Sequence, residues 1–247
     1  MSGHSKWAGI KHKKAIVDAQ KGKTFGKLIR EVTVAARQGG DPDANPRLRL
    51  AMAKARDANM AKDKVEQAIK RGTGEIPGVH YEEIQYEGYG PGGVAILADT
   101  LTDNKNRTSS EIRSLFANHG GNMAGAGSVA WLFHKKGFIL IKQAGVSEER
   151  LIEIALEAGA EDVTSEDDNF AVTTPLQEFD RVKAALTQDR IAWESADLTM
   201  IPSTTVKVDG AKAKHVLELV EILEQHDDVQ NVHANFDIPD EILSTMT

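Results

Sequence analysis

The sequence contains no cysteine. This absence excludes disulfides, a thiol nucleophile and thiolate metal ligands, and it is typical of a reducing compartment. No apolar run approaches the roughly 18 residues of a membrane-spanning helix. The basic N-terminus is not followed by the apolar segment of a secretory signal. We therefore expect a soluble cytoplasmic protein with no membrane partner.

Catalytic and metal-binding motifs are missing as well. The chain has no GxSxG, and its eight histidines show no HExxH or other ligand spacing. The glycines of EGYGPGG, residues 87–93, lack the Lys-Ser/Thr of a phosphate loop and lie between two expected strands, so a hairpin turn is favoured. The carboxylates of 148–168 are typical of a solvated acidic face. We expect no enzyme activity, no metal and no cofactor.

Positive charge is scarce overall and concentrated at the start of the chain. The formal net charge is -7, from 30 Lys and Arg against 37 Asp and Glu. Residues 1–71 nevertheless hold 17 Lys and Arg against 7 Asp and Glu, which leaves 13 against 30 for the rest. A basic segment joined to an acidic body is typical of a protein that contacts nucleic acid with one part only.

The basic segment has helical periodicity. From Thr24, apolar residues recur every 3.6 residues, and Lys and Arg follow the same period on another face. A glycine pair ends this helix. Asn45 as N-cap and Pro46 in the first turn then predict the start of a second helix.

A third helix is expected over residues 61–71, where Val65 and Ile69 face inward and Gly72 and Gly74 end the helix. Together these features predict a basic helical domain over 1–78 that includes a lysine-rich N-terminal arm.

After this domain, short strands alternate with helices, which predicts an α+β protein. We expect an N-terminal helical bundle followed by two ferredoxin-like α/β domains, one inserted in the other. The discontinuous domain covers 79–134 and 203–240, and the inserted domain covers 135–202. The strands assigned to the discontinuous βαββαβ unit are VAILADTL, SVAWLFHK, TTVKV and VQNVHANF, with EEIQYEG as a further strand.

The basic surface of the first domain is the strongest candidate for a binding site. Lysines can neutralise phosphates, and Trp7 either stacks on a base or folds back on the bundle. The motif DNKNRT, residues 103–108, begins a helix, where capping is favoured over a secondary phosphate contact. The expected nucleic-acid-binding residues are Lys6, Trp7, Lys11, His12, Lys13, Lys14, Lys21, Lys23, Lys27, Arg30, Arg47, Arg49, Lys105 and Arg107.

The segment HGGNMAGAGS, residues 119–128, has four glycines. It is interpreted either as a mobile loop that orders against a partner or as a simple connector.

The chain resembles the YebC family, also called YebC/PmpR, in six ordered segments: GHSKWAGIKHKK, DAQKGKTFGKLIRE, GGDPDANPRLR, YEGYGPGG, DNKNRT and HGGN…GSVAWLF. The similarity extends over essentially the whole chain. It implies three domains, with a helical N-terminal domain and a third domain inserted in the second. Because the similarity begins at residue 3, we expect a bacterial member without a mitochondrial presequence.

The resemblance implies regulation through nucleic acid but leaves the template open. Family members are commonly described as transcriptional regulators and DNA-binding proteins of the bacterial cytoplasm. Others are mitochondrial translational activators, and some are connected to ribosomes stalled on proline-rich stretches. A DNA-binding transcription regulator is therefore the first hypothesis. The alternative is a ribosome- or RNA-associated translation factor, since lysine-rich surfaces without base readout suit structured RNA. We expect a monomer.

Overall fold

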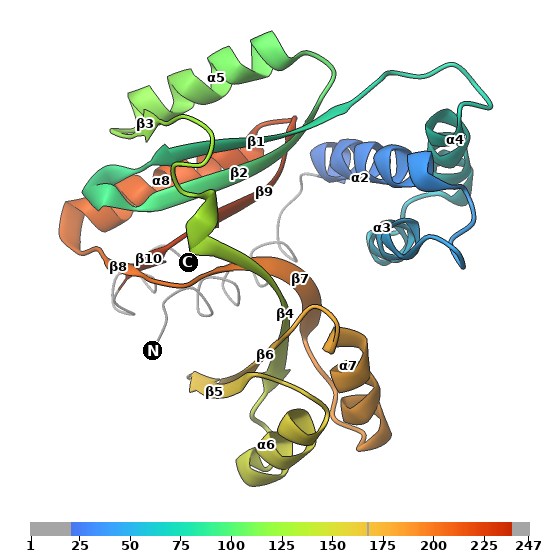
Figure 1. Ribbon diagram of the computed structural model, residues 1–247, viewed down its shortest axis with the longest axis vertical. Helices are drawn as coiled ribbons and strands as arrows, with labels where there is room; N and C mark the ends of the chain where they lie inside the picture. The colour runs from blue at the N-terminus through green and yellow to red at the C-terminus, as the bar shows by residue number, and fades with distance from the viewer. Residues whose placement is uncertain (1–20, 167, 239–247) are drawn as a thin grey trace.

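The structure is a computed structural model of the 247-residue chain, and its description covers residues 21–166 and 168–238 (Figure 1). Within these residues the chain forms helices, two antiparallel sheets and a small parallel pair of strands, so the expected α+β class is confirmed. None of the described helices is long and apolar enough to cross a membrane.

The helical domain is built by α2 (Lys21–Ala35), the short 3-10 turn η1 (Ala36–Gln38), α3 (Pro46–Asp57) and α4 (Lys62–Thr73). Its small core contains Val32, Leu48 and Val65, with Phe25 and Ile29 packed against it. As predicted, Asn45 is the N-cap of α3, and its side chain accepts a hydrogen bond from the backbone N–H of Leu48 at 3.1 Å.

Two helix ends differ from the expectation. α2 begins at Lys21 and not at Thr24. α4 continues through Gly72 because this glycine lies against α2, where a Cβ atom would come within 2.3 Å of the Thr33 carbonyl oxygen. Gly74 ends the helix in the left-handed conformation, with φ of 83°.

The first sheet has the strand order β3-β1-β2-β9 and is antiparallel throughout. Both α5 (Lys105–Asn118) and α8 (Gly210–Gln225) pack on one of its faces, where Phe116, Leu219 and Val232 belong to one core. Its strands are β1 (Glu82–Tyr89), β2 (Ala95–Thr102), β3 (Asn122–Met123) and β9 (Val229–Ala234).

The strands assigned to this sheet from the sequence were partly wrong. SVAWLFHK does not pair in it: residues Ala130–Leu132 form the 3-10 turn η3, and the chain then enters β4 (Phe133–Lys142). TTVKV contributes only β8 (Val206–Lys207), which pairs in parallel with β10 (Phe236–Asp237) in a separate two-stranded sheet. The place expected for one of these strands is taken by β1, which pairs with β2. The loop between β1 and β2 is very short, so the entropy cost of closing this hairpin is small.

The second sheet has the order β5-β6-β4-β7, and the chain order β4-α6-β5-β6-α7-β7 makes it a ferredoxin-like unit. β4 was expected as two strands but is continuous because its first residue, Phe133, is buried in one core and Ile139 and Ile141 in another. The remaining elements are α6 (Glu148–Glu157), β5 (Asp162–Glu166), β6 (Asn169–Thr174), α7 (Phe179–Gln188) and β7 (Ser195–Pro202).

In the chain, this whole unit lies between β3 and β8. In Figure 1 the helical domain lies to one side of the first sheet, and the second sheet with α6 and α7 projects below it. The described protein therefore consists of three packed units, each with its own buried cluster.

Candidate nucleic-acid interface

The basic stripe of α2 faces the C-terminal end of α8. Lys23 Nζ donates to the carbonyl oxygen of Gln225 at 3.2 Å, and Lys27 Nζ donates to that of Glu224 at 2.6 Å. The last carbonyls of a helix have no partner within the helix and carry partial negative charge. Two residues expected to bind nucleic acid therefore cap a helix of the acidic body in this structure.

Asp228, three residues beyond α8, lies at the centre of the same contact. Its side chain is only 3% exposed, and one oxygen accepts hydrogen bonds from Arg107 and Thr108, both at 2.6 Å. Arg30 of α2 pairs with the other oxygen at 3.4 Å and also donates to the carbonyl of Asp227. Burial alone would raise the pKa of Asp228, but these hydrogen bonds and cations hold it below its ordinary value.

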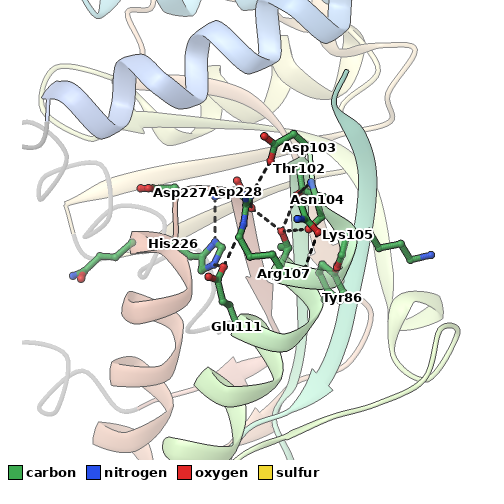
Figure 2. Close-up of polar contacts among 12 residues, drawn as sticks. Tyr86, Thr102, Asp103, Asn104, Lys105, Arg107, Glu111, His226, Asp227 and Asp228 are labelled. Carbon is green, nitrogen blue, oxygen red and sulfur yellow. Dashed lines mark hydrogen bonds and ion pairs between the residues drawn. The ribbon is translucent and has the colours of Figure 1, made fainter. Parts of the chain in front are cut away.

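The DNKNRT motif forms a helix cap, as its sequence favoured. Asn104 accepts a hydrogen bond from the backbone N–H of Arg107 at 3.1 Å, and the Arg107 guanidinium lies between Asp103, at 2.9 Å, and Asp228 (Figure 2). The hydrogen bond with Asp228 is the main cause that raises the pKa of Arg107. Arg107 is thus neutralised within the chain, whereas the side chain of Lys105 is exposed.

Glu111, His226 and Asp228 have side-chain atoms close enough to suggest a metal site. His226 Nδ1, however, accepts the backbone N–H of Asp228 at 3.2 Å, so Nε2 carries the proton and donates to Glu111 at 3.0 Å (Figure 2). With both ring nitrogens engaged and Arg107 on the carboxylate, this cluster is an ion-pair network that joins α5 to the end of α8.

Further cations dock the helical domain on the α/β units. Arg47 forms a two-pronged contact with Glu83 of β1, with both distances 2.9 Å, and a third hydrogen bond to Glu31. The Glu83 hydrogen bond is the main cause that raises the pKa of Arg47. Lys54 pairs with Asp197 of β7 at 3.1 Å. The acidic body therefore neutralises part of the basic domain directly.

Other basic side chains of the helical domain remain accessible. Arg49 is exposed and donates to two carbonyls in the loop before α3. Arg56, Lys64 and Lys70 are exposed, and no described acidic group lies within ion-pair distance of them. Arg56 belongs to the basic surface expected from the sequence for the second helix, whereas Lys64 and Lys70 of α4 were not singled out.

The arm residues lie outside the described part of the chain. This applies to Lys6, Trp7, Lys11, His12, Lys13 and Lys14, and also to the side chain of Lys21. Their role in binding stays a prediction.

A buried carboxylate shapes the glycine-rich loop, and sequence reasoning missed it. Glu87 of β1 is 5% exposed and accepts the backbone N–H groups of Gly127, Val129 and Ala130 at 2.6 to 2.8 Å. Burial would raise the pKa of Glu87, but these donors hold it below its ordinary value. The loop is therefore fixed at its C-terminal end. Glu87 sits in an ordinary strand pattern, and no motif marks it.

Fold and contacts together define a class of protein: a basic helical domain docked through ion pairs on two acidic α/β units. Family models agree with this division. Residues 5–75 match the TACO1/YebC protein N-terminal domain, and residues 81–236 match the TACO1/YebC second and third domain. The chain belongs to the TACO1/YebC family, as its sequence motifs predicted.

Curated relatives are named regulators and not enzymes. The chain is 58% identical over 98% of both chains to a "Probable transcriptional regulatory protein" of Syntrophobacter fumaroxidans. It is 55% identical, over the full length of both chains, to a protein of the same name from Dictyoglomus turgidum. The crystal structure of the conserved hypothetical protein Aq1575 from Aquifex aeolicus matches with a TM-score of 0.84 at 49% identity, covering 96% of this chain and 99% of that one.

Proposed function

We propose that the protein is a nucleic-acid-binding regulator of gene expression that acts through its basic helical domain and arm, as a DNA-binding transcriptional regulator. The segregation of charge carries this proposal: residues 1–71 hold 17 Lys and Arg against 7 Asp and Glu in a chain of net charge -7. The names of the relatives support a regulatory role.

One feature of the helical domain favours DNA. The connection between α3 and α4 is short, residues 58–61, and Asn59 in it has a φ of 58°. A turn of this length joins the two helices of DNA-binding helix-turn-helix motifs. The exposed residues of α4 include Lys64, Gln67 and Lys70, which are polar side chains able to contact phosphates and base edges.

A second candidate, an RNA- or ribosome-associated translation factor, is favoured by the acidic residues within the same surface. Asp63 and Glu66 lie among the cations of α4. They would repel the regular phosphate rows of a duplex, whereas a structured RNA offers phosphates at irregular positions. In either case the contacts are chiefly electrostatic.

The test is the salt dependence of binding by the full-length protein to a DNA duplex and to a structured RNA. With about six phosphates contacted, affinity falls on the order of a thousandfold between 50 and 200 mM salt. Replacing Arg56, Lys64 and Lys70 by Ala should weaken binding and flatten the slope. The matched control removes three exposed lysines elsewhere: Lys207, Lys212 and Lys214.

A shallow salt slope, or equal losses in both triple variants, would contradict the proposal. The two candidates separate in cell lysate: a translation factor cosediments with ribosomes and is released by RNase, whereas a transcription regulator is released by DNase.

A further inference from the structure

Trp131 is the most exposed large hydrophobic side chain of the described residues, at 67%. It lies in η3, between Val129 and Phe133, which are both buried in a small core with Leu97 of β2. Because the chain is anchored on both sides of Trp131, the indole cannot turn inward without removing one of these anchors. The fold itself therefore presents the ring to solvent.

A second aromatic ring is held beside it. Trp131 Nε1 donates to the carbonyl oxygen of Ser128 at 3.1 Å, and the hydroxyl of Tyr89 donates to the same oxygen at 3.2 Å. Tyr89, at the end of β1, is 39% exposed. Both rings are thus tied at their polar atoms, which leaves their faces as the surfaces available for contact.

The carbonyl that holds both rings belongs to the loop fixed by Glu87. Its neighbours Gly127 and Val129 donate their backbone N–H groups to this buried carboxylate, both at 2.6 Å. Burying a charge is costly unless it is fully hydrogen-bonded. Here the Glu87 charge orders residues 127–130, and the Ser128 carbonyl within that segment holds the two exposed aromatic rings. A simple connecting loop would need neither the buried charge nor the exposed rings.

The surroundings of the pair favour a nucleobase over a protein surface. The other exposed large hydrophobic side chains of the described residues lie on different elements, namely Leu50, Val79, Leu156 and Leu176. A protein-docking site needs a contiguous apolar patch, whereas one or two planar rings suffice to stack an unpaired base. The loop before Trp131 ends in Gly125, Ala126, Gly127 and Ser128, small residues that let a ligand approach closely.

We propose that Trp131 and Tyr89 form a stacking site for an unpaired base of single-stranded nucleic acid. The site rests on the proposed nucleic-acid function and adds to it a preference for unpaired over duplex segments. Stacking needs no base-edge hydrogen bond, so the preference is independent of sequence.

The experiment measures affinities of the full-length protein for a 12-nucleotide oligo(U), an oligo(dT) of equal length and a 12-base-pair duplex, at fixed salt. Trp131→Ala should weaken binding of the single strands about 5- to 150-fold, and should change duplex binding less than twofold. Trp131→Phe should retain most of the affinity. Leu156→Ala is the control for removal of an exposed apolar side chain and should leave every affinity unchanged.

Fluorescence gives a direct readout. Saturating oligo(U) should quench the wild-type protein more strongly than Trp131→Phe, because a stacked base quenches the indole. Equal quenching, or a loss that is the same for duplex and single strand, overturns the stacking site. If the wild-type protein binds in a salt-dependent way and Trp131→Ala binds single strands normally, only this inference fails. If the wild-type protein binds no nucleic acid, the proposed function fails with it.

Discussion

Arg30 of α2 and Asp228, just beyond α8, form an ion pair of 3.4 Å between the basic helical domain and the acidic body. Asp228 is buried and also accepts hydrogen bonds from Arg107 and Thr108 of α5. One carboxylate thus joins three helices that are distant in sequence. The acidic body does more than accompany the basic domain, because it provides the charges on which that domain docks.

The first prediction concerns stability. Asp228→Asn replaces one carboxylate oxygen by an NH2 group that cannot accept a hydrogen bond. Either Arg107 and Thr108 on one side or Arg30 on the other therefore loses its acceptor, and the negative charge is lost. We expect the free energy of unfolding to fall by about 1–3 kcal/mol. The loss is smaller than that for breaking a fully buried ion pair, because both arginines can be rehydrated by solvent. Urea denaturation measures the change.

The matched control is Asp189→Asn, which breaks an ion pair with Arg150 on the surface of the inserted unit. It should leave the urea midpoint unchanged, since exposed pairs contribute little. Equal midpoints for both variants would show that Asp228 does not hold the units together.

The second prediction is that docking and phosphate binding compete. Lys23 and Lys27 each donate a hydrogen bond to the end of α8, and Asp228 partly neutralises Arg30, so docking weakens the attraction of these three cations for phosphates. Asp228→Asn removes one docking charge, so affinity for a DNA duplex or structured RNA should rise severalfold at 100 mM salt, although the protein is less stable. Filter binding or fluorescence anisotropy measures it.

Competition also predicts a difference in shape. Small-angle scattering should show the helical domain released from the acidic body in the Asp228→Asn protein. If the domain is released but the variant binds nucleic acid no more tightly than the wild type, the basic stripe of α2 is not part of the nucleic-acid interface. The contacts would then be confined to the arm and to the exposed side chains of α3 and α4.

The helices of the basic domain were predictable because their signals are local. Asn45 and Pro46 mark the start of α3, and the period of apolar residues in α2 gives its buried face. The same period shows which face of α2 is basic but not what that face meets. The partner is the end of α8, roughly two hundred residues later, which no local pattern indicates.

The strands show the same limit. Residues 133–142 read as two strands because Lys135, Lys136 and Gly137 interrupt the apolar pattern. Gly137 lies against Phe179, where a Cβ atom would be 2.3 Å from its ring, so this glycine permits helix packing and does not end the strand. Gly137 and Glu87 both contact residues about forty positions away in the chain, so the local sequence around them does not indicate their roles.

The third prediction follows from the lowered pKa values of Glu87, Asp228 and Asp99. Burial would raise the pKa of Asp99 in β2, but hydrogen bonds with His233, at 3.1 Å, and Gln85, at 2.8 Å, hold it below its ordinary value. Each carboxyl group binds protons more readily in the unfolded chain than in the folded one. Their stabilising effect is therefore complete above the ordinary carboxyl range, near pH 5, and is lost as the pH falls through the folded-state values. Urea midpoints between pH 6 and pH 3 should decrease steadily.

Glu87→Gln tests how much of the stability lost on acidification comes from the Glu87 carboxylate that holds the glycine-rich loop. An amide nitrogen facing the backbone donors of Val129 and Ala130 costs about 1–3 kcal/mol at neutral pH. The variant should then lose less stability on acidification than the wild type, because one titrating group is gone. Parallel pH profiles for the two proteins would show that folding does not lower the pKa of Glu87.

The last prediction concerns the arm. Lys11, Lys13 and Lys14 belong to the most basic stretch of the chain, where no sustained apolar period is found. Replacing all three by Ala should weaken binding to a phosphate-rich partner and reduce the salt slope by up to about three ions, since each neutralised phosphate contributes nearly one. The urea midpoint should stay at the wild-type value, because a segment without a sustained apolar period has no continuous apolar face to bury. If the triple variant unfolds, or binds as tightly as the wild type, the arm is a structural element and the excess of lysine at the start of an acidic protein has another cause.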